Sequence, residues 1–199
     1  MPKGVMIVAE HRDGSLRKVT YELAGLGRKL ADARGEQLAA VLVGHGVSGL
    51  AGALAERGVD LVYLADDERL ASYSTGAYSR VISELVGQAE PSVLLFGATA
   101  IGKDLAPRVA GRLGAGLASD CTEVEIGADG GLEVTRPMYA GKVLAEVGDF
   151  RGWPQMATVR PNVFPPAPAQ AGRKADVVSA PVNVGPDDLR AVVIEAIKA

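Results

Sequence analysis

The sequence is poor in cysteine, lacks a long hydrophobic run and carries little net charge. Its one cysteine, Cys121, excludes an internal disulfide framework and suits a reducing cytosol. No stretch reaches the roughly 18 apolar residues of a membrane-spanning helix, and the first residues resemble neither a secretory nor a transit leader. The net charge of −3 comes from mixed signs along the chain, so no basic face favours nucleic acid or an anionic membrane. We therefore expect a soluble cytoplasmic protein, most simply bacterial, without a nucleic-acid partner or membrane insertion.

What the sequence does contain is a globular composition and a regular alternation of patterns. Hydrophobic residues make up 48% and charged residues 23% of the 199 positions, which suits one domain with a sizeable core. Short apolar runs predict buried strands at residues 4–10, 37–44, 59–66 and 91–97. Apolar side chains at helical spacing predict helices from about residues 15, 49, 75 and 103. In the first helix, Ser15 is the expected N-cap and Gly35 the expected left-handed C-terminal residue.

This order of strands and helices predicts the fold class. Strands that are apolar throughout, separated by amphipathic helices, are typical of a parallel sheet with helices on both faces. Right-handed crossovers then give an α/β fold, a doubly wound and mainly parallel Rossmann-like sandwich. In such sheets, ligands and partners meet the carboxyl ends of the strands.

The pattern changes after residue 114. Four segments between residues 117 and 161 alternate like strands without a helix between them, which predicts an antiparallel extension at the sheet edge. The Pro/Ala-rich stretch 165–174 predicts a linker, and residues 175–199 predict one more strand and a helix. We therefore divide the chain into a domain at 1–164, a linker at 165–174 and a C-terminal strand and helix at 175–199.

The stretch "GATAIGKD" at residues 97–104 resembles the phosphate loop of a P-loop NTPase, but one position differs. The residue after Lys103 is Asp104, which cannot supply the hydroxyl that holds Mg²⁺ in such loops. Since proline is tolerated mainly in the first turn of a helix, Pro107 predicts a helix that begins near Asp104, with Asp104 as its N-cap. Gly97 and Gly102 then serve a tight backbone rather than a phosphate. We therefore reject the hypothesis of a nucleotide-cleaving P-loop.

Residues 94–124, "LLFGATAIGKDLAPRVAGRLGAGLASDCTEV", resemble the N-terminal domain of the electron transfer flavoprotein alpha subunit. Two more landmarks of that family follow in order, "RPMYAGK" at 136–142 and "MATVRPNVF" at 156–164, and residues 7–31 are similar to its first strand and helix. The resemblance covers about residues 1–164. It implies a fold related to adenine-nucleotide-binding domains, in agreement with the sandwich predicted above.

The resemblance also implies a function, a cofactor and partners. Proteins of this family are FAD-containing heterodimers of alpha and beta subunits. They pass electrons from acyl-CoA dehydrogenases or similar flavoenzymes, as in fatty acid β-oxidation, to a respiratory acceptor through a quinone reductase. In the family, FAD is held mainly by a C-terminal domain with a Gly-Gly-Arg-Gly run, which this sequence lacks. We therefore expect a scaffold domain that binds partners, that holds no FAD when alone and that precedes the FAD domain of the complete protein.

Few polar residues are candidates for a site. The resemblance makes Arg136, Tyr139, Lys142 and Arg160 candidates for contact with the beta subunit or the flavin domain, although these residues could simply be edge-strand residues that face water. We identify no catalytic residue, and therefore expect an electron carrier subunit rather than an enzyme. The isolated histidines at positions 11 and 45 predict no metal site, and Cys121 is interpreted as a core residue. The alternative function is an adenine-nucleotide-binding module of the universal-stress type, with its ligand at the strand ends.

Overall fold

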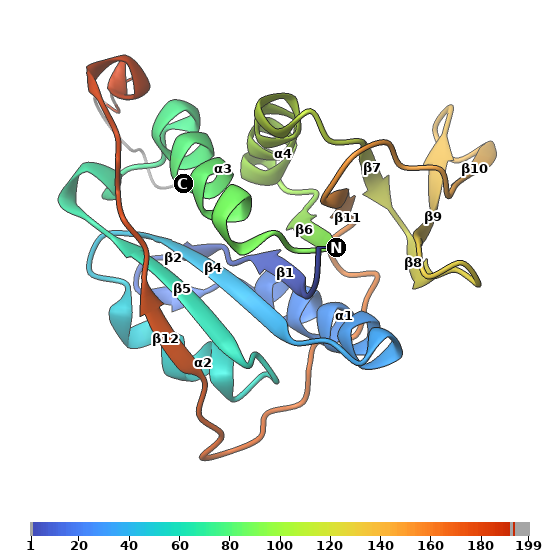
Figure 1. The fold of residues 1–199 in the computed structure, drawn as a ribbon, viewed down its shortest axis with the longest axis horizontal. Helices are drawn as coiled ribbons and strands as arrows, with labels where there is room; N and C mark the ends of the chain where they lie inside the picture. Colours follow the sequence, from blue (N-terminus) through green and yellow to red (C-terminus); the bar gives the residue numbers. More distant parts are fainter. Residues whose placement is uncertain (1, 192, 194–199) are drawn as a thin grey trace.

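The computed structural model describes residues 2–191 and 193, and its centre is a parallel sheet of seven strands (Figure 1). The strand order is β12-β5-β4-β1-β6-β11-β7, and every neighbouring pair in it is parallel. The strands are β1 (Val5–Val8), β4 (Leu38–Gly44), β5 (Leu61–Asp66), β6 (Val93–Gly97), β7 (Leu117–Cys121), β11 (Gln155–Val159) and β12 (Asp176–Ser179). The predicted α/β doubly wound fold is confirmed.

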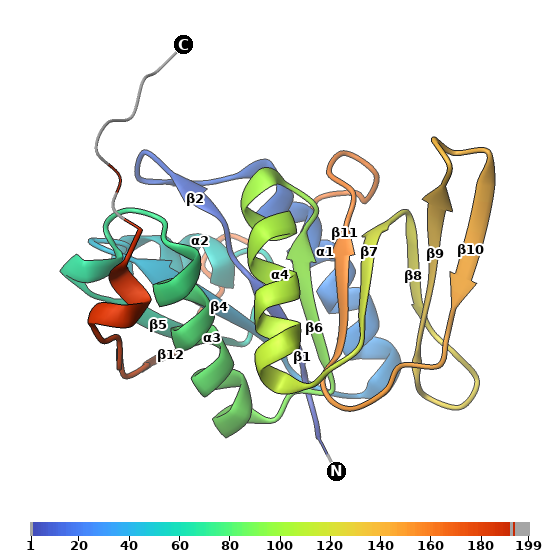
Figure 2. The ribbon, with the colours of Figure 1, turned by 90° about the horizontal axis from the view of Figure 1, so that it is seen from above.

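Two layers of helices cover the sheet, one on each face (Figures 1 and 2). The helices are α1 (Lys18–Arg34), α2 (Ala51–Ala55), α3 (Thr75–Ala89) and α4 (Ala100–Leu113). Along β1, Val5 and Ile7 pack into the cluster that contains α1 and α2, whereas Met6 and Val8 pack into the cluster that contains α3 and α4. Because successive strand residues point to opposite faces, the all-apolar strands predicted from the sequence supply both cores.

The start of α1 differs from the prediction. Ser15 lies in β3 (Ser15–Leu16), which pairs with β2 (His11–Arg12) in a small hairpin, and α1 begins at Lys18. Its N-cap position is Arg17, which makes no side-chain capping bond. Because Ser15 and Leu16 are paired in this hairpin, the helix cannot extend back to them, and Ser15 cannot serve as the N-cap of α1. At the other end, Gly35 has φ 63° and ends the helix in the left-handed conformation, as predicted.

The antiparallel extension is smaller than predicted. A separate sheet contains β8 (Glu123–Ile126), β9 (Leu132–Met138) and β10 (Val143–Val147), in the order β10-β9-β8. The prediction was wrong for β7 and β11, which belong to the central sheet. All five residues of β11 are buried and it lies between β6 and β7. A short apolar run of this kind suits a buried parallel strand. The sequence did not indicate a parallel strand here, because no long helix of the described chain follows α4.

The C-terminal part of the described chain lies against the domain. The segment 165–174 is tied by backbone bonds from Ala167 N to Tyr21 O and from Gln170 N to Glu56 O, each within 2.9 Å. The predicted strand is present as β12 and pairs with β5. Of the helix predicted over 185–199, the described residues form the 3-10 helix η3 (Pro186–Leu189), whereas residues 192 and 194–199 lie outside the described residues. Within residues 2–191 and 193, no helix is long and apolar enough to cross a bilayer.

Candidate functional site

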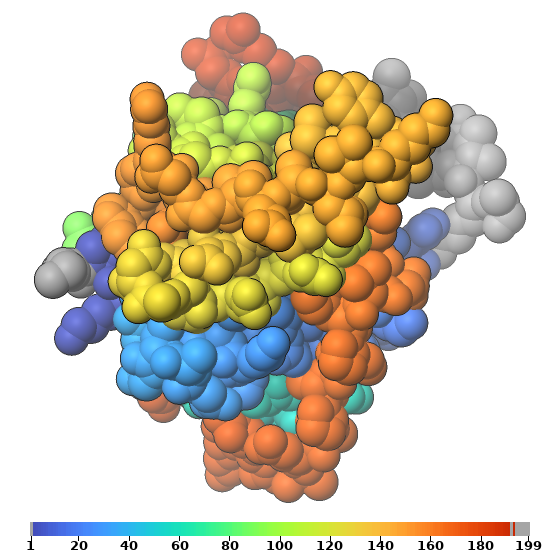
Figure 3. All heavy atoms as spheres, turned by 90° about the vertical axis from the view of Figure 1, so that its right-hand side faces the viewer, coloured from blue at the N-terminus to red at the C-terminus, as the bar shows by residue number. Residues whose placement is uncertain are grey.

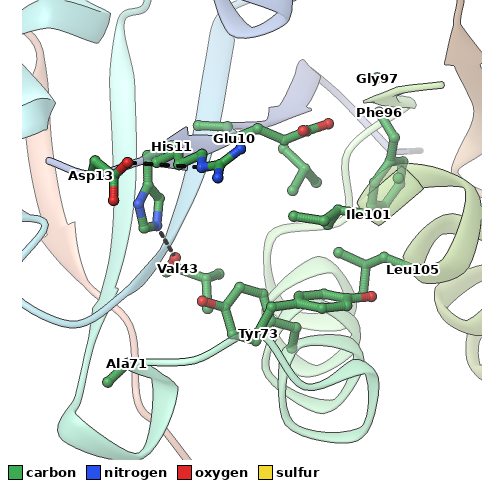
Figure 4. Close-up of a pocket in the computed structure, with 15 residues that line it drawn as sticks. Glu10, His11, Asp13, Val43, Ala71, Tyr73, Phe96, Gly97, Ile101 and Leu105 are labelled. Carbon is green, nitrogen blue, oxygen red and sulfur yellow. Dashed lines mark hydrogen bonds and ion pairs between the residues drawn. The ribbon is translucent and has the colours of Figure 1, made fainter. Parts of the chain in front are cut away.

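A cleft opens at the carboxyl ends of β1, β4 and β6 (Figure 4). In the central sheet, β4 lies on one side of β1 and β6 lies on the other side. The chain runs from β1 through α1 to β4 and later returns to β6, so the strand order reverses between β1 and β6. Ligands bind at such switch points in doubly wound sheets. The cavity measures about 240 Å³. In Figure 4, Glu10 and His11 lie on one side of the opening and Ala71 and Tyr73 on the opposite side, while Ile101 and Leu105 of α4 form the wall on the right.

Glu10 is the buried acid of this cleft, with 7% of its surface exposed. Its Oε1 accepts a hydrogen bond from Thr99 Oγ1 at 2.8 Å, and its Oε2 accepts one from Arg17 Nη1 at 2.9 Å. Burial raises the pKa of Glu10 above its usual value, although Thr99 and Arg17 act in the opposite direction. The sequence analysis missed Glu10. Its position directly after the first strand, at the ligand-binding edge of the sheet, is the feature that could have revealed it.

The two histidines lie just past the carboxyl ends of β1 and β4. His11 Nε2 lies 2.9 Å from the carbonyl oxygen of Val43, so this nitrogen carries the proton and donates. His45 Nδ1 lies 3.7 Å from Asp66 Oδ1 at an exposed position. Among the described residues, no group of three or more His, Cys, Asp or Glu side chains could hold a metal ion.

The turn "GATAIGKD" begins α4 earlier than predicted, and Asp104 does not cap it. The N-cap is Thr99, whose Oγ1 accepts a hydrogen bond from Gly102 N at 3.1 Å and whose carbonyl accepts one from Lys103 N. Pro107 therefore lies inside α4 rather than in its first turn. It is tolerated there because the carbonyl that loses a partner belongs to Lys103, on the same solvent-exposed face of the helix. Two of the amides that a P-loop would offer to a phosphate, those of Gly102 and Lys103, are thus bonded to Thr99.

Asp104 instead links α4 to the start of α3. Its Oδ2 accepts hydrogen bonds from the hydroxyl groups of Tyr73, at 2.6 Å, and of Thr75. These bonds hold the pKa of Asp104 below its usual value. Burial, together with the bond to Asp104, raises the pKa of Tyr73. Asp104 therefore fixes one wall of the cleft from outside it.

Replacing Thr99 by alanine is expected to lower the free energy of unfolding by about 1 kcal/mol, because the N-cap bond of α4 is lost. The change also removes a hydrogen bond to the buried Glu10 carboxylate. Lys103→Ala is the matched control in the same turn, since the exposed lysine side chain caps nothing, and its effect is expected to stay within about 0.5 kcal/mol. Urea denaturation measures both. Equal losses in the two variants would contradict the assignment of Thr99 as the cap.

The interface candidates predicted from the sequence occupy two places. Arg160 Nη2 lies 2.7 Å from Asp120 Oδ2 at the ends of β7 and β11, and this bond, with the nearby cations, lowers the pKa of Asp120. Arg136 is one of those cations, so the structure brings Arg136 and Arg160 together around Asp120. Tyr139 and Lys142 lie apart from them, in the turn between β9 and β10.

That turn carries an exposed apolar surface, which we call the hairpin patch. It consists of Met138, Tyr139, Val143 and Leu144, with exposed fractions of 37%, 75%, 48% and 64%. Figure 3 shows β8, β9 and β10, in yellow and orange, spread over the face of the molecule above α1. Tyr139 and Ala140 have φ values of 50° and 55°, which L-residues adopt at a cost of about 1 kcal/mol or more each. Backbone strain of this kind is found preferentially at functional sites.

An acidic groove lies beside the hairpin patch on the same small sheet. Its volume is about 420 Å³, and it is lined by Glu123, Glu125, Glu133 and Glu146. The sequence analysis missed this groove, although the alternating glutamates of β8, one of which pairs with Glu133 of β9, could have revealed it. By contrast, Cys121 is buried as predicted, and burial raises the pKa of its thiol to about 11.

Comparison with known proteins gives consistent results. A family model described as "Electron transfer flavoprotein domain" matches residues 5–184. The chain is 44% identical over 198 residues to Protein FixB of Clostridium saccharobutylicum, covering 99% of this chain and 59% of that protein. It is 41% identical over 196 residues to electron transfer flavoprotein subunit alpha of Thermoanaerobacterium thermosaccharolyticum, covering 98% and 59%. It is 35% identical over 221 residues to acryloyl-CoA reductase electron transfer subunit beta of Anaerotignum propionicum, covering 98% and 60%. The chain thus spans about 60% of the length of these relatives.

Proposed function

Since the chain belongs to the electron transfer flavoprotein family, as its sequence motifs predicted, we propose that it is the N-terminal, partner-binding part of an alpha-type subunit. The complete protein would pair with a beta subunit and carry electrons from flavoprotein dehydrogenases to a quinone reductase. This chain would contribute no catalytic residue. The universal-stress-type alternative is not favoured. The division of the chain at residues 164 and 174 and the cytoplasmic location stay predictions.

The hairpin patch is the observation that carries this proposal. Large apolar side chains gathered on a projecting turn are unusual on a protein surface unless a partner covers them. Charged groups surround them, with Lys142 in the same turn and the acidic groove on the same sheet. An apolar centre with a charged rim is the usual anatomy of a protein–protein interface, and tyrosine is enriched among the residues that contribute most of its binding energy.

The described cleft does not fit FAD. Its volume of about 240 Å³ lies below the roughly 300–1,000 Å³ of pockets that enclose drug-sized ligands, and a dinucleotide is larger than these. At the start of α4, the amides of Gly102 and Lys103 are bonded to Thr99, so these two are not available to a pyrophosphate. These observations support the proposal that FAD is held by other parts of the complete protein and that this chain alone holds none.

Co-expression with the cognate beta subunit, followed by size-exclusion chromatography, tests the proposal. We expect the two chains to co-elute without FAD, and the double variant Tyr139→Asp, Leu144→Asp to weaken the complex by at least about 100-fold, since each removes a large apolar contact. The matched control is Val177→Asp, Val178→Asp, which places two carboxylates on the exposed strand β12.

The control variant is expected to co-elute like the unchanged chain. If the hairpin variant also co-elutes unchanged, or if the β12 variant alone abolishes the complex, the assignment of the hairpin patch as the interface is wrong. Circular dichroism on both variants establishes that they are folded, since all four positions are exposed.

A further inference from the structure

The switch-point cleft has the features of a ligand site of its own, and none of its lining residues belongs to the hairpin patch. Its volume of about 240 Å³ lies just below the roughly 300 Å³ of the smallest pockets that enclose drug-sized ligands. This is room for a compact ligand of two or three fused rings, but not for a dinucleotide.

Aromatic rings form much of the lining. Tyr73, Tyr78 and Phe96 all line the cleft, and the rings of Tyr73 and Tyr78 meet edge to face with their centroids 5.1 Å apart. Both hydroxyl groups are already bonded, Tyr73 to Asp104 and Tyr78 to the carbonyl of Leu70. The tyrosines therefore offer ring surface rather than hydrogen bonds, and an aromatic ligand gains from stacked or edge-to-face contact with such rings.

The charges around the cleft are balanced in pairs. Glu10 is bonded to Arg17, and Arg12 Nε lies 3.8 Å from Asp13 Oδ2. A phosphate would meet no unpaired cation among these lining groups, and the amide of Gly102 in the first turn of α4 is already bonded to Thr99 Oγ1. It would also lie near the Glu10 carboxylate. These features select a neutral ligand.

Two acceptors remain available to the ligand. A carboxylate accepts about four hydrogen bonds, and Glu10 accepts one from Thr99 and one from Arg17. In neutral His11, Nε2 donates to Val43 O, so Nδ1 is an acceptor. A ring that carries N–H groups can donate to these atoms, whereas a pure hydrocarbon would leave them without partners.

We propose that the switch-point cleft binds a neutral, planar nitrogen heterocycle of two or three fused rings, stacked against Tyr73 and Tyr78 and held by the Glu10 carboxylate. The site selects against phosphorylated forms of the same ring. This proposal is independent of the beta-subunit interface, because it concerns other residues at another edge of the sheet.

Isothermal titration calorimetry on the purified chain tests the site with two matched pairs of probes, adenosine against adenosine monophosphate and riboflavin against flavin mononucleotide. We expect saturable binding of at least one neutral probe, with its phosphorylated counterpart weaker by about tenfold or more. Ala71→Trp at the exposed rim is expected to abolish that binding, and Ala128→Trp in the β8–β9 turn, also exposed, to leave it unchanged. Glu10→Gln is expected to weaken it by about tenfold.

Three results would each overturn the proposal. One is the absence of saturable binding by both neutral probes. Another is equal or tighter binding of the phosphorylated probes, which would mean a phosphate site. The last is unchanged binding in Ala71→Trp, which would place the ligand elsewhere on the chain. None of these results bears on co-elution with the beta subunit, so the two proposals fail separately.

Discussion

Replacing Gly102 by alanine is expected to lower the free energy of unfolding by about 3 kcal/mol, although the residue lies in a helix, where alanine is normally the better choice. A Cβ atom at this position would lie 1.8 Å from the carbonyl oxygen of Gly97. That atom belongs to the backbone of β6 and cannot rotate away. Helix α4 must therefore move off the sheet, which opens the core that Leu105 and Val109 share with the central strands.

Gly111→Ala is the matched control in the same helix. No atom lies within 4 Å of a Cβ built there, and the residue is exposed, so helix propensity alone decides its effect. We expect a gain of about 0.5–1 kcal/mol from this change. In thermal unfolding, Gly102→Ala should lower the midpoint by roughly 10 °C, and Gly111→Ala should raise it slightly. A Gly102→Ala variant as stable as the wild type would show that α4 does not pack this closely on β6.

The close contact between Gly102 and the carbonyl of Gly97 explains why "GATAIGKD" resembles a phosphate loop. The spacing of Gly97 and Gly102 serves the close approach of a helix to a strand, as the sequence analysis inferred for tight backbone. What the sequence could not show is which residue caps the helix. Thr99 and Asp104 are both good N-cap residues, and Pro107 favoured the later start. The choice depends on tertiary contacts, since Thr99 also donates to Glu10, 89 residues away.

The topology could be predicted in the part of the chain where strands and helices alternate. It could not be predicted in the part where several strands follow one another without a helix. The strands β1, β4, β5 and β6 follow from apolar runs bounded by turns, and α3 begins at the predicted residue 75. The place of β11 beside β6 depends on a long return of the chain past β8, β9 and β10. No local pattern encodes that return, because a buried run such as Met156–Val159 pairs equally well with several strands.

The candidate sites were predictable only in part, for a related reason. The segment that contains Tyr139 and Lys142 was identified through family motifs, and its exposed apolar surface became visible only in the structure. The cleft combines residues from β1, β4, β6, α4 and the loop before α3. A sequence indicates which edge of the sheet they share, but their distances and the pairing of Glu10 with Arg17 depend on the complete fold.

Asp60 is the partly buried centre of a charge network that fastens the segment 165–174 to the domain. Its Oδ2 accepts hydrogen bonds from Leu38 N at 2.9 Å and from Arg28 Nη1 at 2.7 Å, and its Oδ1 accepts one from Arg173 Nη2 at 2.6 Å. Burial raises the pKa of Asp60, but these three donors outweigh it, so the pKa lies below the ordinary value of 3.8. Arg173 lies in the stretch that the sequence predicted as a linker, and this network explains why the stretch lies on the domain surface.

Replacing Asp60 by asparagine is expected to lower the free energy of unfolding by about 2 kcal/mol at pH 7, because two guanidinium groups lose their carboxylate. The sign of the pH dependence follows from the lowered pKa. A carboxylate with a lowered pKa in the folded state contributes stability above its unfolded pKa and loses it as the pH falls through the folded value. The difference in free energy of unfolding between the unchanged chain and Asp60→Asn should therefore be largest at pH 7 and should decrease below about pH 4. Urea denaturation at a series of pH values measures it.

The control for this prediction is Asp187→Asn. Asp187 pairs with Arg190 at 2.7 Å, but both side chains are largely exposed, at 86% and 77%, so its loss should change the stability by less than about 0.5 kcal/mol at any pH. Trypsin gives a second readout, because Arg173 and Lys174 are cleavage sites inside the fastened segment. Cleavage there should be faster in Asp60→Asn than in Asp187→Asn, since the segment opens more often once Arg173 is released. A stability gap that persists unchanged at low pH, with equal cleavage rates in both variants, would mean that Asp60 acts through its shape rather than through its charge.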